Sequence, residues 1–329
     1  MMTTFLRRFS ADHPLSALIL RRLGLSLILL LAVSLLIFVG VEALPGDFAT
    51  TYLGQAATPQ AVANIRAELG LDQPVLGRYV QWLGGALQGD FGASWASRMP
   101  VACQIADRLG NSLFLAAVAA IIAIPLAILL GLVAVLTRDT FLDRAINVVT
   151  LAAISLPEFF VGYLLILVFA VNLGIATFPS TIFAGMTLGD KLQAIALPVA
   201  TLVLVVLAHM MRMTRAAIIS VLSSAYMETA ELKGLGAWRA ILRHAAPYAI
   251  APIVNVVALN LAYLIVGVVV VEVVFVYPGM GQYMVDAVTV RDMPVVQACG
   301  LIFAAVYILL SMTADIIAIV SNPRLRHPR

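Results

Sequence analysis

The sequence predicts an all-α integral membrane protein with about six transmembrane helices, and three observations lead to this fold class. Of the 329 residues, 62% are hydrophobic and only 11% are charged, whereas soluble domains have about 45–50% apolar and about 25% charged residues. The charges are clustered, which leaves six long stretches without Asp, Glu, Lys or Arg. None of these stretches alternates in polarity, so we expect helices that are solvated by lipid.

Each uncharged stretch is long enough to cross a bilayer. A hydrocarbon core of about 30 Å requires about 20 helical residues, because a helix rises about 1.5 Å per residue. We therefore expect transmembrane helices near residues 22–43, 110–136, 146–173, 193–213, 247–275 and 297–320.

The distribution of basic residues predicts the orientation. With both termini in the cytoplasm, six of the 20 Lys and Arg residues lie outside and 14 lie inside, as the positive-inside rule requires. The same bias accounts for the net charge of +3, so nucleic acid is not expected as a partner. The predicted order of segments is a cytoplasmic segment 1–21, a first helix 22–43, a periplasmic loop 44–108, a five-helix domain 109–320 and a cytoplasmic tail 321–329.

The loop 44–108 carries the signals of two short amphipathic helices. Thr58-Pro59 gives an N-cap and a first-turn proline, and Gly70 ends that helix. A second helix starts near Pro74 and ends before Gly89. Two such helices predict a small cap that lies on the membrane surface or packs on the helix ends, and an inert connecting loop is the alternative.

The inside segment 214–246 has the residues of a helix, a turn at Gly234 and a second short helix. In that short helix Trp238, Ile241, Leu242 and Ala245 are spaced to share one face. An apolar stripe at this place either docks into another protein or lies on the bilayer or on its own helices, and periodicity leaves both readings open.

The sequence lacks the common catalytic motifs. It contains no G-x-x-x-x-G-K-[ST], H-E-x-x-H, G-x-S-x-G or G-x-G-x-x-G, so it is not expected to be an enzyme or to bind ATP itself. The ionisable residues near or inside the spans are few, namely Glu42, Glu158, Glu272 and Asp315. Glu158 and Glu272 either line a solute path or are structural carboxylates bonded to neighbouring helices.

The two cysteines, Cys103 and Cys299, are both expected toward the outer face. Either they form a disulfide or they are two buried thiols. Two cysteines and four scattered histidines do not predict a metal site.

The segment from Glu228 to Gly234, Glu-Thr-Ala-Glu-Leu-Lys-Gly, resembles the E-A-A-x-x-x-G loop of ABC importer permeases, with Thr229 in place of the first alanine. Pro247 stands where that loop's closing proline is expected.

The chain as a whole resembles the dipeptide/oligopeptide/nickel permease family, in particular its B-type subunit. The segments that carry this resemblance run through the sequence in one order, and the outer segment 174–192 is shorter than in many members. They are 44–47 (Leu-Pro-Gly-Asp), 69–74 (Leu-Gly-Leu-Asp-Gln-Pro), 89–92 (Gly-Asp-Phe-Gly), 230–244, 272–281 (Glu-Val-Val-Phe-Val-Tyr-Pro-Gly-Met-Gly), 291–297 (Arg-Asp-Met-Pro-Val-Val-Gln) and 322–326.

This resemblance implies the permease subunit of a type I ABC importer in the bacterial inner membrane, with peptides or peptide-like solutes as cargo. The implied partners are a second, homologous permease, two cytoplasmic ATPase subunits, a periplasmic solute-binding protein and membrane lipid. No cofactor is expected on this chain, and ATP and magnesium are expected in the ATPase subunits.

Two groups of site residues follow from the resemblance and from the intramembrane carboxylates. The predicted coupling site, which contacts the ATPase, consists of Glu228, Thr229, Ala230, Lys233, Gly234, Leu235 and Trp238. The candidate translocation path or gate consists of Glu158, Glu272, Pro278, Gly279 and Gly281.

Two other functions are weighed beside this one. A self-sufficient secondary carrier or channel predicts transport by the chain alone, and a membrane anchor predicts that replacing Glu158 or Glu272 leaves uptake unchanged. Mid-membrane acids form no relay in the sequence, which favours an outside source of energy.

Overall fold

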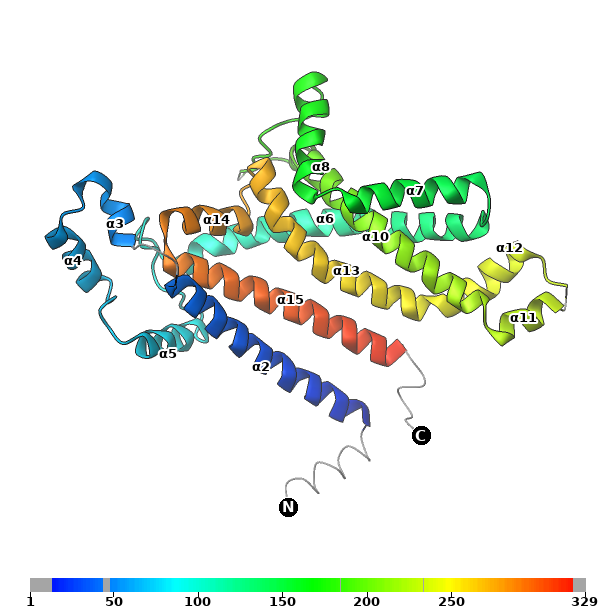
Figure 1. Cartoon of the computed structure of the whole chain (residues 1–329), viewed down its shortest axis with the longest axis horizontal. Coiled ribbons are helices and arrows are strands. Elements are labelled where there is room, and N and C mark those ends of the chain that lie inside the picture. Colours follow the sequence, from blue (N-terminus) through cyan, green and yellow to red (C-terminus); the bar gives the residue numbers. More distant parts are fainter. Residues whose placement is uncertain (1–13, 44–47, 184, 233, 322–329) are drawn as a thin grey trace, which may run out of the picture.

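A computed structural model of the chain describes residues 14–43, 48–183, 185–232 and 234–321, and these residues form a helical bundle (Figure 1). Five helices are long and apolar enough to cross a membrane. They are α2 (Pro14–Glu42), α6 (Val101–Leu136), α10 (Ala196–Leu222), α13 (Ala246–Phe275) and α15 (Met293–Ser321). A bent pair brings the number to six if it counts as one span, which agrees with the predicted number.

The bent pair corrects the prediction of one continuous helix over 146–173. Here α7 (Phe141–Ser155) is followed by α8 (Glu158–Leu165), which continues into the π-helical segment η2 (Ile166–Asn172), and the two halves meet at 102°. The cause is Pro157, which lacks an N–H donor and forces Leu156 into an extended conformation with φ −91° and ψ 131°. Figure 1 shows α8 leaving the bundle beside α7.

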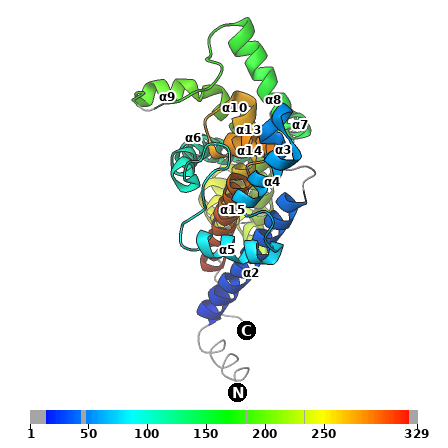
Figure 2. The ribbon, with the colours of Figure 1, turned by 90° about the vertical axis from the view of Figure 1, so that its left-hand side faces the viewer.

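The short elements gather at the two ends of the bundle. At the cap end, on the left of Figure 1, lie α3 (Phe48–Leu53), η1 (Gly54–Ala56), α4 (Pro59–Glu68), α5 (Val75–Ala86) and α14 (Met280–Val290). At the loop end, on the right, lie α11 (Ala225–Leu232) and α12 (Ala237–Ala240). The remaining helix, α9 (Leu188–Ala194), precedes α10 and is seen in Figure 2.

The two predicted helices of the cap are confirmed. The Thr58 hydroxyl caps α4 by accepting from the backbone N–H of Ala61 at 3.3 Å, and Gly70 follows the helix with φ +66°. The helix α5 starts directly after Pro74, and Gly89 lies beyond its end with φ +79°. Positive φ at both glycines explains why these helices stop there.

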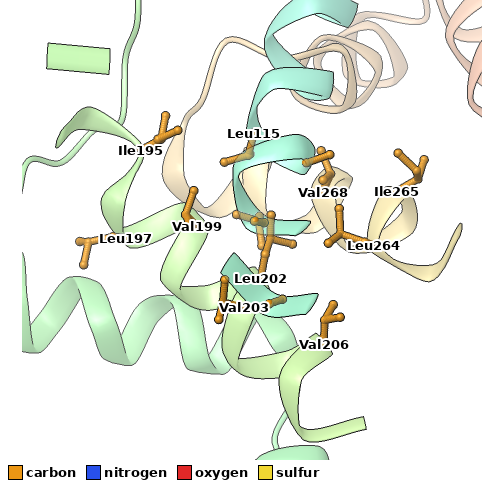
Figure 3. Close-up of a cluster of buried hydrophobic side chains, with 14 of the residues drawn as sticks. Leu115, Ile195, Leu197, Val199, Leu202, Val203, Val206, Leu264, Ile265 and Val268 are labelled. Atoms are coloured by element: carbon orange, nitrogen blue, oxygen red, sulfur yellow. The ribbon is translucent and has the colours of Figure 1, made fainter. Parts of the chain in front are cut away.

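The core lies where α6, α10 and α13 meet (Figure 3). Leucine, isoleucine and valine side chains of α10 and α13 pack against a row of alanines on α6, spaced four residues apart at Ala119, Ala123 and Ala127. At Gly131 the helices are so close that an added Cβ would meet the Thr214 side chain at 2.9 Å. Small residues of this kind let membrane helices approach closely.

Three predicted helices are clearly too short at one end. The helix α2 begins at Pro14 rather than at 22, α6 begins at Val101 rather than at 110, and α10 ends at Leu222 rather than at 213. Each extension carries charged residues, for example Arg21, Asp107 and Arg215. Charge marks the limit of an apolar stretch, but it does not stop a helix.

Candidate coupling and translocation sites

The predicted coupling residues lie at the tip of the loop end. Glu228 and Thr229 are exposed on α11, Ala230 belongs to the same helix, and Leu235 is half-buried. Lys233 lies outside the described residues. Gly234 makes the turn toward α12 with φ +78°, a backbone conformation that only glycine adopts without strain.

The helical turns on either side of this turn are anchored by their inner residues. Met227 and Ala245 are fully buried and pack against Val221 and Leu222 at the end of α10. In contrast, Leu232 and Trp238, which flank Gly234, are 84% and 63% exposed. The loop end therefore exposes two large apolar side chains on a segment that its buried residues fix to α10.

The prediction that the short helix carries an apolar stripe along one face is wrong. Ile241 and Ala245 are buried, whereas Trp238 and Leu242 are exposed. The reason is that α12 ends after one turn and residues Ile241–Ala245 form the π-helical segment η3. A π-turn has more residues per turn than an α-helix, so the spacing i, i+3, i+4, i+7 no longer defines one side.

Four of the five candidate gate residues, Glu272, Pro278, Gly279 and Gly281, come together around the carboxylate of Glu272. This side chain is fully buried near the end of α13. Its Oε1 accepts from the Ser112 hydroxyl of α6 at 2.5 Å, and its Oε2 accepts from the backbone N–H groups of Gly281 and Gln282 at 2.6 and 3.2 Å. The carboxylate thus satisfies two of the free N–H groups at the start of α14.

Gly279 and Gly281 leave the space that this carboxylate fills. A Cβ on Gly279 would overlap the Glu272 carboxyl group, and one on Gly281 would lie 2.8 Å from both Glu272 Oε2 and the backbone Cα of Val269. These two positions therefore require glycine because of contact rather than backbone conformation.

The turn between α13 and α14 is also tied to Asn111 of α6. The Asn111 amide donates to the Pro278 carbonyl at 2.8 Å, and the Tyr277 hydroxyl donates to the Asn111 carbonyl at 2.9 Å. Burial, and then the charge of Glu272, raise the pKa of Tyr277 well above its usual value, so the hydroxyl stays a donor. Pro278 takes part in the cluster through its backbone.

Glu158 does not join this cluster. It lies at the break between α7 and α8, where its Oε1 accepts from the Tyr263 hydroxyl at 3.2 Å. Its Oε2 would be 3.0 Å from a Cβ on Gly267, so a glycine of α13 makes room for it. Irregular backbone at membrane depth is tolerated only where protein covers it or water reaches it. Glu158 is partly exposed at this break.

The other two acids named from the sequence are ion-paired. Arg78 of α5 pairs with Glu42 at the end of α2 at 2.5 Å, and Arg22 of α2 pairs with Asp315 of α15 at 2.5 Å. These pairs join the cap to α2 and α2 to α15.

Two buried carboxylates escaped the sequence analysis. Asp143, at the start of α7, is held by both the Nε and Nη2 atoms of Arg215 at 3.1 and 2.9 Å. Asp292, between α14 and α15, accepts from the Ser94 hydroxyl and from the backbone N–H groups of Trp95 and Ala96 at 2.5, 3.1 and 3.1 Å. Thr140-x-x-Asp143 was a readable capping signal, whereas nothing near Asp292 in sequence pointed to its partners.

Aromatic packing adds to the attachment of the cap. Phe48 is buried against Trp95 with ring centroids 5.3 Å apart, and Tyr79 of α5 stacks edge-on against Phe38 of α2 at 5.3 Å. The Tyr79 hydroxyl also lies 2.9 Å from the buried Ser34 hydroxyl. The structure thus favours a packed cap over an inert loop.

The predicted alternative of a disulfide is wrong, because Cys103 and Cys299 are both free thiols. The alternative of two buried thiols holds only for Cys299, since Cys103 is exposed in the first turn of α6. Among the residues that the structure describes, no cluster of His, Cys, Asp or Glu could hold a metal ion.

The long apolar helices, with the packed cap at one end and the exposed tip at the other, define a multi-pass membrane protein. The chain belongs to the family described as binding-protein-dependent transport system inner membrane component, whose model matches residues 123–327. The companion model for the N-terminal part of such components matches residues 15–116. The protein is therefore a permease subunit of a binding-protein-dependent ABC importer, and it works with other components of such a system.

Relatives that are named as transport permeases agree with this assignment. The chain is 38% identical over 313 residues to the glutathione transport system permease protein GsiC of Escherichia coli K12, which covers 95% of this chain and 99% of the relative. The protein of the same name from Shigella dysenteriae serotype 1 matches with the same identity and coverage.

Proposed function

We propose that this chain couples ATP hydrolysis in companion subunits to the uptake of peptide-like solutes across the bacterial inner membrane. The companions are a second, homologous permease, two cytoplasmic ATPases that hold ATP and magnesium, and a periplasmic solute-binding protein. The cargo class is proposed from the relatives, which are named glutathione transport permeases.

In this proposal the segments have defined sides. The cap and α14 face the periplasm, the loop end faces the cytoplasm, and both termini are cytoplasmic. The Arg and Lys distribution supports this orientation, because 14 of the 20 basic residues then lie inside. Glu158, Glu272, Pro278, Gly279 and Gly281 are proposed to lie on the path or to control it.

One observation supports coupling more than any other, namely the tip at Gly234. A turn with φ +78° separates two helical elements that are anchored through Met227 and Ala245 and present Leu232 and Trp238 outward. Large apolar side chains exposed together are typical of a protein contact. An ATPase that binds this tip can bias the bundle toward one orientation, because it contacts a segment fixed to α10 and α13.

Two glycines of the tip allow a matched test. Gly234 and Gly236 both have open space where a Cβ would stand, but only Gly234 has a positive φ. Gly234→Ala and Gly234→Pro should lower ATP-driven uptake in the reconstituted complex while the chain still inserts, and Gly236→Ala should leave uptake near wild type.

The readout is solute uptake together with ATP hydrolysis by the same complex. Hydrolysis that continues without uptake in the Gly234 variants supports the proposal. Normal uptake by Gly234→Pro contradicts the role of the tip, and uptake by the chain alone under a proton or sodium gradient contradicts the proposed function itself.

A further inference from the structure

The broken span α7–α8 is attached to the bundle at two separate places. Only Asp143 and Thr150 are buried in α7, and the Thr150 hydroxyl lies within hydrogen-bond distance of backbone carbonyls of its own helix. Asp143 is therefore the buried side chain that joins α7 to another helix, through Arg215 of α10. Large apolar side chains of α7, for example Phe141 and Val149, are exposed. The ion pair is thus the main polar attachment of this half.

The contact between Asp143 and Arg215 fixes direction as well as distance. The Nε atom of Arg215 donates to Oδ1 at 3.1 Å, and its Nη2 atom donates to Oδ2 at 2.9 Å. The same two oxygens accept from the Asn147 side-chain amide at 2.8 Å and from the backbone N–H of Asp139 at 3.3 Å. A carboxylate with a two-point guanidinium contact and two further donors has little freedom to turn. The start of α7 is therefore tied to α10.

Arg215 lies near the base of the coupling tip. Val221 and Leu222, at the end of α10, hold the tip through Met227 and Ala245. Leu222 follows Arg215 by seven residues, or about 10 Å along a helix. Figure 1 shows α7 running beside α10 from the loop end toward the middle of the bundle. The tip and α7 are thus fixed to the same end of α10.

The second half of the broken span is fixed to α13 instead. A Cβ on Gly162 of α8 would lie 3.0 Å from the Val274 side chain, and the Tyr263 hydroxyl donates to Glu158 at 3.2 Å. The tip connects the end of α10 to the start of α13. A displacement of α10 relative to α13 therefore has to change the angle at Pro157, which is 102° here, and with it the position of Glu158.

We propose that Asp143 and Arg215 transmit movement of the coupling tip to Glu158, because they make α7 follow α10 while α8 stays with α13. Both are positioning residues, which act on the path through Glu158. In this proposal the broken span is the element with two arrangements that coupling between distant sites requires. The inference rests on the proposed function for the driving force at the tip and for the place of Glu158 on the path.

Removal of the ion pair should separate ATP hydrolysis from uptake in the reconstituted complex. Asp143→Asn and Arg215→Gln should each lower ATP-driven uptake of glutathione at least about fivefold, the lower end of usual coupling effects. ATP hydrolysis should continue, because the tip and its ATPase contact are unchanged. Asp139→Asn is the matched control, since the Asp139 carboxylate lies close by but is exposed and pairs with the exposed Arg138. The control should transport as the parent does.

A spin label on α8 shows whether the bend itself moves. Tyr163 is 57% exposed, so Tyr163→Cys combined with Cys103→Ser places one accessible thiol on α8, while the buried Cys299 stays unlabelled. Trapping the complex with ATP and vanadate should change the spectrum of this label in the parent and leave it unchanged in Asp143→Asn. A purely structural ion pair would not remove this response while hydrolysis continues.

Normal uptake by Asp143→Asn and Arg215→Gln overturns the inference. So does a Tyr163 label that ignores ATP in the parent or still responds in Asp143→Asn. Arg215→Lys keeps the charge but loses the two-point contact, so it decides the test if the uncharged variants do not assemble. Equal loss of uptake and hydrolysis in Arg215→Lys would reduce the pair to a structural contact and overturn the inference as well.

The same measurements separate this inference from the proposed function. A parent complex without ATP-driven uptake contradicts the proposed function. A parent complex that couples hydrolysis to uptake, with ion-pair variants that do so equally well, refutes this inference alone.

Discussion

The carboxylate of Glu272 and the backbone amide of Gly281 are joined by a hydrogen bond of 2.6 Å inside the protein. The same carboxylate accepts from Ser112, so one side chain connects α13 to both α14 and α6. A role of Glu272 in the solute path stays a prediction. Its contacts are those of a structural carboxylate that holds three helices together.

Glu272→Ala should destabilise the protein, because the buried N–H groups of Gly281 and Gln282 and the Ser112 hydroxyl lose their acceptor. We expect a loss of about 1–3 kcal/mol for each donor left unpaired. Thermal unfolding of the detergent-solubilised chain measures it, with the exposed Glu68→Ala as control. Equal stability of the two variants would show that this network contributes little.

Gly281→Ala should be harmful even with Glu272 in place, because the new methyl group meets the backbone of Val269. Overpacking of this kind costs about 1–3 kcal/mol. Gly84→Ala is the matched control, since Gly84 lies within α5 with open space around it. There the exchange should stabilise the helix slightly, so the two variants should shift the melting temperature in opposite directions.

Asp143→Ala and Arg215→Ala should each cost about 1.5–3 kcal/mol, as expected for charge-assisted hydrogen bonds that are partly buried. The two losses should not add in the double variant, because each removes the same pair. A double-variant cycle by thermal unfolding measures the coupling. The exposed pair Arg138 and Asp139 serves as a control and should show almost no coupling.

Glu158→Gln should lower uptake by the reconstituted complex without changing stability, because Glu158 is partly exposed and has one side-chain partner, Tyr263. Tyr263→Phe tests whether the hydroxyl contributes by orienting that carboxylate. Asp286→Asn, an exposed carboxylate on α14 that belongs to neither candidate site, controls for loss of a carboxylate elsewhere. Unchanged uptake in Glu158→Gln would remove Glu158 from the proposed path and would favour a purely anchoring chain.

The proposed orientation can be checked with the native cysteines. In intact cells with a permeable outer membrane, a membrane-impermeant maleimide should label the exposed Cys103 and leave the buried Cys299 unlabelled. Cys103→Ser should abolish the signal. In that background Trp238→Cys should react only after the inner membrane is permeabilised, and the reverse pattern would invert the topology.

Much of the fold was predictable because it depends on local patterns. Continuous apolar stretches gave the membrane helices, and Thr58 and Gly70 gave the limits of α4. The bend at Pro157 lies inside a stretch that was predicted as one span, because apolar composition continues through it and sets no angle between the two halves. The π-helical turn after Ala240 was also missed, since no residue pattern announces it.

The candidate sites were predicted less completely, because their partners are distant in sequence. The glycines at 279 and 281 were named together with Glu272, but Ser112, which completes the cluster, lies 160 residues away. Asp292 and Ser94 are 198 residues apart. Periodicity and motifs describe neighbours along the chain, and such contacts form only when the helices pack.

The Glu272 cluster has a mechanical consequence. Hydrogen bonds join Asn111 and Ser112 of α6 to the end of α13 and to the turn before α14. We therefore expect the cap-side ends of α6 and α13 to move together as one rigid unit. Any change of access must then pivot elsewhere, and both helices contain a proline nearer the loop end, Pro125 in α6 and Pro252 in α13. If the tip moves, we expect the bundle to bend at these prolines while the cap-side ends of the two helices move together.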